Sequence, residues 1–213
     1  MINTIVVEDN VYIQKHFMNL LDAARFRVVD SFRDAFEAEE ACRGGNIDLV
    51  LMDVQTYRNH SGLAAGKRIR QKYRRTKVVI VTSLIDPVIL EQAKQGAAYS
   101  LWYKDHGDDE IMNVIERTLN GERIFPDSSP RVEMKEMFSS DITPRQMEIL
   151  RRFVYGMTYE EIAEDLKLTK RGVRWNLDQI VEKGGFQNKH ELLAVVIENR
   201  LIVTTLEESR WFS

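Results

Sequence analysis

Short apolar runs alternate with longer amphipathic segments from residue 1 to residue 121. The apolar runs lie at 2–7, 28–29, 49–52, 78–81 and 100–103. Between them, apolar positions recur at intervals of three and four, which predicts helices at 11–21, 35–42, 63–73, 87–95 and 108–120. The run 49–52 is apolar at every position, as in strands that are covered on both faces. The pattern therefore predicts an α/β doubly wound, five-stranded parallel sheet with helices on both faces.

The pattern changes beyond residue 121. Residues 126–130 read Pro-Asp-Ser-Ser-Pro, a combination typical of a break between domains, and a short helix is predicted at 132–138. Further on, Thr143 and Thr158 stand at helix N-cap positions before segments of helical periodicity. The predicted organisation is a first domain at 1–122, a linker at 123–140, a small all-α domain at 141–203 and a C-terminal tail at 204–213.

Composition and charge narrow the class of protein. The chain has 213 residues, of which 44% are hydrophobic and 30% charged, as in ordinary globular proteins. Its net charge of -3 gives no whole-chain sign of nucleic-acid binding, so any such site must be a local patch. Cys42 is the only cysteine, which excludes an intrachain disulfide and a multi-cysteine metal site. Without a secretory signal or an apolar stretch near the ~20 residues of a membrane helix, we expect a cytoplasmic protein with no membrane partner.

Polar residues follow four of the predicted strands. Glu8 and Asp9 follow the first strand, Asp53 the third, Thr82 the fourth and Lys104 the fifth. Because sites in such sheets form at the carboxyl ends of the strands, we expect these side chains at one edge. Three carboxylates there repel one another, and a divalent cation such as Mg²⁺ relieves the repulsion. Asp53 can then attack a phosphoryl donor, while Lys104 neutralises the moving group and Thr82 hydrogen-bonds one of its oxygens.

The ordered set Glu8-Asp9, Asp53, Thr82 and Lys104 resembles the receiver domain of two-component response regulators. This resemblance implies a CheY-like fold in which Asp53 accepts phosphate from a histidine kinase. It also implies that Mg²⁺ is held by Asp9, Asp53 and the backbone carbonyl of Gln55, with Glu8 acting partly through water.

The chain departs from the receiver pattern at several positions. The usual proline four residues after Asp53 is absent, and Gly62 comes one residue later than the usual glycine, which predicts a reshaped loop. Asp105 follows Lys104 where the family usually has proline. Leu101 occupies the position of the usual switching tyrosine or phenylalanine. We therefore expect an altered structural readout of phosphorylation.

Two of the predicted C-terminal helices are joined by a tight turn at 167–169 and form a helix-turn-helix. In that motif the second helix lies in the major groove, with its N-terminal residues near base edges. One face of the helix predicted at 170–183 is rich in lysine and arginine, which can contact phosphates. Arg174 can also read guanine. The predicted DNA-binding residues are Lys170, Arg171, Arg174, Trp175, Asp178, Lys183 and Lys189.

Segments 142–150, 156–166 and 173–183 resemble a LuxR-type domain, and the two halves together resemble a transcription regulator of the NarL/FixJ type. Gly172 stands where the family usually has threonine, and Asn176 where it often has histidine. Asp178 either accepts a hydrogen bond from cytosine or weakens binding. Trp175 either touches a thymine methyl group or packs against the receiver domain in the inactive form.

The final predicted helix, at 189–199, carries more apolar surface than a three-helix core needs. A dimer contact, which the resemblance also implies, explains the excess, and ordinary core packing is the alternative.

The leading hypothesis is a DNA-binding transcription regulator, not an enzyme, in which phosphorylation of Asp53 favours a homodimer that spans two half-sites. The expected partners are promoter DNA and a cognate histidine kinase.

Other functions have different sequence requirements. One alternative is a DNA-binding regulator whose atypical receiver is controlled by a ligand or a protein partner instead of phosphorylation. A phosphohydrolase of the haloacid dehalogenase type needs a second aspartate two residues after the nucleophile, and Gln55 occupies that position. The helix-turn-helix argues against a pure protein-binding adaptor.

Overall fold

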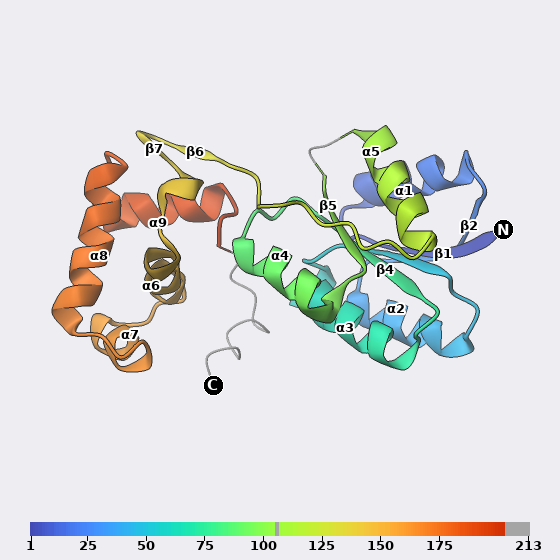
Figure 1. Cartoon of the computed structure of the whole chain (residues 1–213), viewed down its shortest axis with the longest axis horizontal. Coiled ribbons are helices and arrows are strands. Elements are labelled where there is room, and N and C mark those ends of the chain that lie inside the picture. Colours follow the sequence, from blue (N-terminus) through green and yellow to red (C-terminus); the bar gives the residue numbers. More distant parts are fainter. Residues whose placement is uncertain (105–106, 203–213) are drawn as a thin grey trace. The chain divides into compact units, whose positions relative to one another are not determined.

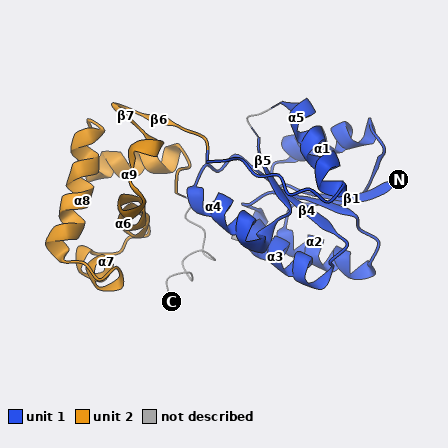
Figure 2. Ribbon diagram, in the orientation of Figure 1, with its two compact units in different colours: residues 1–129, 205–207 blue, residues 130–204, 208–213 orange. Residues whose placement is uncertain are grey.

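The computed structural model of the chain describes residues 1–104 and 107–202. These residues divide into two compact units, one ending at Ser129 and the other beginning at Pro130 (Figure 2). The change of unit falls inside the predicted linker. Among the described residues, no helix has both the length and the hydrophobicity that a membrane crossing requires.

The first unit is a five-stranded, fully parallel sheet with strand order β2-β1-β3-β4-β5 (Figure 1). Its strands are β1 (Ile2–Val7), β2 (Phe26–Phe32), β3 (Leu49–Met52), β4 (Lys77–Thr82) and β5 (Ser100–Tyr103). All four residues of β3 are buried, because the strand lies in the middle of the sheet and is covered on both faces. The predicted doubly wound α/β fold is confirmed.

Helices cover both faces of this sheet, as Figure 1 shows. One face carries α1 (Val11–Asp22) and α5 (Asp108–Leu119), and the other carries α2 (Ala35–Ala41), α3 (Gly62–Lys72) and α4 (Pro87–Gln92). Apolar side chains of α1 and α5, among them Phe17 and Ile111, pack with Val6, Leu51 and Val79 in one core cluster. This packing fixes the strands, and with them the loops at their carboxyl ends.

The helix α4 is shorter than the sequence predicts and continues as a π-helical turn, η3 (Ala93–Ala97). Gly66 of α3 permits this turn to come close, because a Cβ atom there would lie 2.6 Å from the Ala97 carbonyl oxygen. After α5 the chain runs beside β5, where the Leu101 amide donates to the Ile124 carbonyl over 2.9 Å. The sheet edge at β5 is therefore partly covered by the chain itself.

The second unit contains α6 (Pro144–Val154), α7 (Tyr159–Asp165), α8 (Lys170–Lys183) and α9 (Lys189–Glu198). Both predicted N-caps are confirmed: Thr143 and Thr158 each form a capping box, with Gln146 and Glu161 respectively. The core is formed by buried residues from all four helices, including Leu150, Ile162, Leu177 and Leu192.

The predicted helix at 132–138 is wrong. The segment is an antiparallel hairpin of β6 (Glu133–Met134) and β7 (Met137–Phe138), preceding a short 3₁₀ turn, η4 (Ser139–Asp141). Met134 and Met137 are both buried, so their spacing of three residues resembled a helical face. Lys135 adopts the left-handed conformation with φ of 57°, which closes a tight turn instead.

Candidate metal site and nucleic-acid interface

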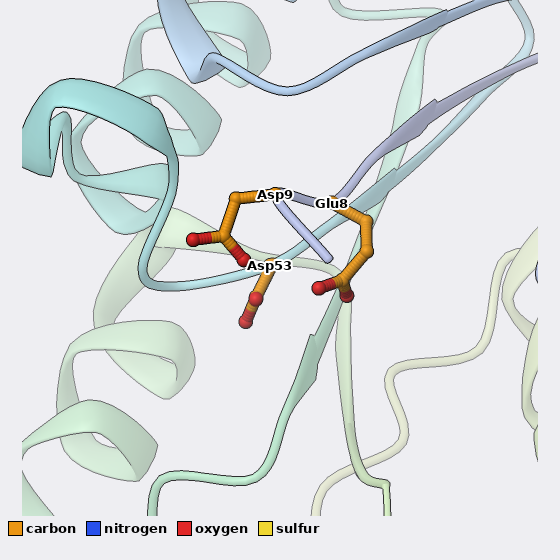
Figure 3. A group of neighbouring side chains, drawn as sticks. All are labelled: Glu8, Asp9 and Asp53. Carbon is orange, nitrogen blue, oxygen red and sulfur yellow. The ribbon is translucent and has the colours of Figure 1, made fainter. Parts of the chain in front are cut away.

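The parallel register brings three carboxylates together at the carboxyl edge of the sheet. Val7 of β1 pairs with Met52 of β3, so the next residues, Glu8 and Asp53, leave their strands side by side. The Asp53 amide donates to the Val7 carbonyl over 3.0 Å. Carboxylate oxygens of Glu8, Asp9 and Asp53 all lie within 4.8 Å of one another (Figure 3). Glu8 and Asp53 are buried and Asp9 is half-buried, and carboxylate oxygens at this spacing suit a hard divalent cation such as Mg²⁺.

Lys104 connects two of these carboxylates. Its Nζ lies 2.5 Å from Glu8 Oε2 and 2.9 Å from Asp53 Oδ2, and all three side chains are largely buried. The Lys104 amide donates to the carbonyl of Thr82 over 2.9 Å, which places the lysine beside the end of β4. Thr82 itself is fully buried, and its Oγ1 accepts from the Leu84 amide over 3.1 Å. The side chains at the carboxyl ends of β1, β3, β4 and β5 therefore form one site.

Burial controls the charge of this constellation. Burial raises the pKa of the Asp53 carboxyl to about 7; the Lys104 ammonium opposes this rise and the Glu8 carboxylate adds to it. Burial alone would lower the pKa of Lys104, but Asp53 and Glu8 outweigh it and raise that pKa. One lysine therefore faces more negative charge than it can balance, which favours a further cation at the carboxylates.

The loop after Asp53 closes as a small hairpin. Gln55 and Ser61 form an antiparallel bridge, and Arg58 at its tip adopts a left-handed φ of 60°. A Cβ atom at Gly62 would lie 1.8 Å from the Asp53 carbonyl oxygen, so only glycine fits where the loop returns. Tyr57 occupies the position of the usual proline, and its amide donates to the Arg33 carbonyl over 2.8 Å, a hydrogen bond that proline cannot make.

The loop is also tied to the segment between β2 and α2, which the sequence did not predict. The Thr56 hydroxyl donates to the His60 carbonyl over 2.7 Å and accepts from the Ala35 amide over 3.1 Å. His60 Nδ1 lies 2.7 Å from Oδ1 of the buried Asp34. The sequence carries no signal for this contact, because an aspartate at the N-cap of α2 is an ordinary capping residue.

Leu101, at the predicted switch position, is completely buried in β5. Tyr103 is buried two residues later, and its hydroxyl donates to Ser129 Oγ over 3.2 Å. No rotating aromatic side chain is therefore present at position 101. Asp105, the other departure noted after Lys104, lies outside the described residues.

Helices α7 and α8 form the predicted helix-turn-helix. The Leu168 amide donates to the Ala163 carbonyl over 2.8 Å, which closes the turn, and Thr169 caps α8 by accepting from the Gly172 amide over 3.0 Å. Val173, Leu177 and Ile180 bury one face of α8. The opposite face exposes Arg171, Arg174 and Trp175, whose side chain is 58% exposed.

Several of the predicted DNA-binding residues contact one another or nearby groups. Asp178 accepts from Lys189 of α9, and its other oxygen lies 3.5 Å from Arg174 Nε. Lys170 pairs with Glu160 of α7, and Lys183 Nζ donates to the Asp141 carbonyl over 3.3 Å. Among the described residues Arg171 makes no ion pair. Asp178 therefore neutralises part of the basic face.

Comparison with known proteins adds two family matches. Residues 4–116 match the response regulator receiver domain family, and residues 140–196 match the luxR family of bacterial regulatory proteins. The transcriptional regulatory protein YvfU of Bacillus subtilis is 27% identical over 93% of this chain and 98% of its own. The oxygen regulatory protein NreC of Staphylococcus aureus is 24% identical over the same shares.

Solved structures share the fold over almost the whole chain. A structure of two RcsB dimers bound to two parallel DNAs has a TM-score of 0.63 at 18% identity, covering 92% of this chain and 98% of that one. RcsB from Salmonella enterica serovar Typhimurium, bound to promoter rprA with the phosphomimetic BeF3-, has a TM-score of 0.60 at 20% identity and the same coverage. At this identity the likeness shows the fold.

Proposed function

The chain belongs to the response regulators of two-component systems, with a receiver domain and a LuxR-type DNA-binding domain, and we propose that phosphorylation of Asp53 controls its binding to promoter DNA. The observation that carries the proposal is the buried triad in which Lys104 joins Glu8 and Asp53. A lysine ammonium held beside a nucleophilic carboxylate supplies part of the charge neutralisation that phosphoryl transfer to aspartate needs.

In the proposed reaction one Asp53 oxygen attacks the phosphorus of a phosphohistidine on the cognate kinase. The new bond forms between that oxygen and phosphorus while the phosphorus–nitrogen bond breaks, and the nitrogen keeps the electron pair and takes up a proton. Lys104 moves its interaction from the Asp53 carboxylate to a phosphoryl oxygen, and Thr82 donates its hydroxyl to another. Glu8 keeps Lys104 in place through their ion pair.

Asp9, Asp53 and the backbone carbonyl of Gln55 would hold Mg²⁺, with Glu8 acting partly through water. When bound, Mg²⁺ supplies charge neutralisation at the carboxylates and the phosphoryl oxygens. The spacing of the three carboxylates supports this assignment.

On the DNA side, we assign phosphate contacts to Lys170, Arg171, Lys183 and Lys189 and a base-reading role to Arg174. Trp175 extends from the same exposed face of α8. Phosphorylation would shift a pre-existing equilibrium toward a homodimer that presents two such helices to two half-sites.

Two observations support a second mode of control. The loop after Asp53 is fastened to α2 through Thr56 and His60, and Leu101 replaces the usual switching aromatic residue. A receiver domain that lacks the usual aromatic switch residue and has this loop fastened is suited to control by a ligand or a protein partner. In that case the DNA-binding unit would act as proposed while phosphate incorporation would be absent.

Phosphate incorporation distinguishes the two. The full chain, treated with Mg²⁺ and a small acyl-phosphate donor, is run on a phosphate-retarding gel beside Asp53→Ala and the control Asp109→Ala. We expect a retarded band in the wild type and in Asp109→Ala, lost in Asp53→Ala and after removal of Mg²⁺ with a chelator. Absence of the band in the wild type, even with candidate kinases, favours control by a ligand or partner.

A further inference from the structure

A strongly basic segment lies in the receiver domain. Between Asp53 and Asp86 the chain has no acidic residue, but it has eight lysines and arginines, seven of them at positions 67–77. These seven lie on α3, in the turn after it and at the start of β4. In a chain with a net charge of -3, this is a local excess of positive charge that the sequence did not link to either site.

Two of these cations share one carboxylate inside the receiver domain. Arg68 Nε lies 2.6 Å from Glu39 Oε2, and Lys72 Nζ lies 2.8 Å from Glu39 Oε1. Glu39 comes from α2 and is buried. These ion pairs join α2 to α3, so Arg68 and Lys72 have a structural role within the receiver domain.

Four of the remaining cations lie near the start of β4, at the opposite end of the sheet from Asp53: Arg70, Arg74, Arg75 and Lys77. Arg70 lies 4.2 Å and Lys77 3.9 Å from the centre of the Tyr99 ring, so one aromatic ring holds two cations. Arg70 Nη1 also donates to the Ala98 carbonyl over 2.6 Å. Arg123 Nη2 donates to the Lys94 carbonyl over 2.6 Å, which brings two more basic residues to this end.

We call this set the basic corner; it consists of Arg70, Arg74, Arg75, Lys77, Lys94 and Arg123. In the described part of the chain none of the six pairs with a carboxylate. Burial lowers the pKa of Arg70, and the charge of Arg123 lowers it further, although Tyr99 opposes both. Arg74 and Arg75 are exposed. The fold thus keeps like charges close without internal compensation, which indicates an anionic partner.

We propose that the basic corner contacts the phosphate backbone of duplex DNA and adds sequence-independent affinity to that of the LuxR-type domain. Six cations exceed what one phosphate group, with a charge of about -2, would balance. A duplex offers a continuous row of phosphates. The inference rests on the proposed DNA binding of the second unit, because that binding brings duplex DNA to the same chain.

The test compares two double variants of the full chain that remove the same charge. Arg74→Gln/Arg75→Gln alters the basic corner, and Lys15→Gln/Arg27→Gln alters exposed cations elsewhere on the receiver domain. Dissociation constants are measured on a random-sequence duplex of about 40 base pairs between about 50 and 200 mM salt. We expect Arg74→Gln/Arg75→Gln to flatten the slope of log affinity against log salt by about 1.8, since each phosphate contact contributes about 0.9. The control should keep the wild-type slope.

The outcomes separate this inference from the proposed function. Arg171→Gln, on α8, removes a proposed phosphate contact and should weaken binding in the same assay; a wild type that binds no DNA overturns both ideas. If Arg171→Gln weakens binding while the two double variants match each other, the basic corner has no contact with DNA and only this inference fails. Vesicles of phosphatidylcholine and phosphatidylglycerol form a parallel arm. Loss of vesicle binding in Arg74→Gln/Arg75→Gln with unchanged DNA binding would assign the corner to an anionic membrane instead and overturn the inference.

Discussion

At the carboxyl edge of the sheet, single side chains make buried contacts that a substitution would remove. Lys104 forms ion pairs with the carboxylates of Glu8 and Asp53. We expect Lys104→Met to lower the free energy of unfolding of the receiver domain by about 3 kcal/mol, because it leaves buried carboxylates unpaired. Urea unfolding with and without Mg²⁺ measures this, with Lys15→Met as the exposed control. An equal, small effect of both substitutions would show that the ion pairs contribute nothing to stability.

Gly62 provides a second test at this scale. Gly62 is the first residue of α3, and helix propensity alone favours alanine over glycine by about 1 kcal/mol. The clash of a Cβ atom with the Asp53 carbonyl reverses the sign, and we expect Gly62→Ala to destabilise the domain by at least about 2 kcal/mol. Gly44→Ala, where a Cβ meets nothing within 4 Å, is the control in thermal unfolding. Comparable melting temperatures would contradict the proposed close approach.

The residues of the acidic site could be predicted from the sequence because parallel strands end at the same edge of the sheet. Glu8, Asp53 and Lys104 lie far apart in the chain, but each directly follows an apolar run. The contact between His60 and Asp34 had no such periodic signal, since both residues lie in loops. Arg58 was equally unpredictable, because nothing in its side chain favours a left-handed backbone.

At the scale of elements, the two helices that meet at Asp178 form the most testable feature. Asp178 holds Arg174 of its own helix and Lys189 of α9, so Asp178→Asn frees Arg174 for a base edge and Lys189 for a DNA phosphate. We expect random-sequence DNA to bind several-fold more tightly, with the salt slope steeper by about 1. Glu182→Gln removes the same charge from the same helix and is the control. If the two variants behave alike, only net charge matters.

Helices were predicted more reliably than turns. Both capping boxes combine a threonine with a glutamate or glutamine three residues later, a local signal that tertiary packing did not override. The hairpin of β6 and β7 was missed because Met134 and Met137 satisfy a helical and a hairpin pattern equally well. The antiparallel pairing of the two strands and the left-handed φ of Lys135 distinguish the hairpin from a helix.

For the whole molecule, the proposed dimerisation can be tested on the surface that α9 leaves uncovered. Leu192 and Val196 are buried, whereas Ile197 is 51% exposed. Core packing therefore explains part of the apolar surface of α9, and we propose that the exposed part forms the dimer contact. We expect Ile197→Lys to keep the phosphorylated chain monomeric in sedimentation equilibrium, while Ile197→Leu dimerises. Dimerisation of both would place the contact on another surface.

The proposed function couples phosphorylation of Asp53 in the first unit to DNA binding by the second. The affinity of the full chain for target-promoter DNA is measured before and after treatment with an acyl phosphate and Mg²⁺, in the wild type and in Asp53→Asn. We predict an increase of at least about tenfold in the wild type, within the usual range of allosteric coupling, and none in Asp53→Asn. If the treated and untreated wild type bind with equal affinity while the gel shows phosphate incorporation, phosphorylation of Asp53 does not control DNA binding.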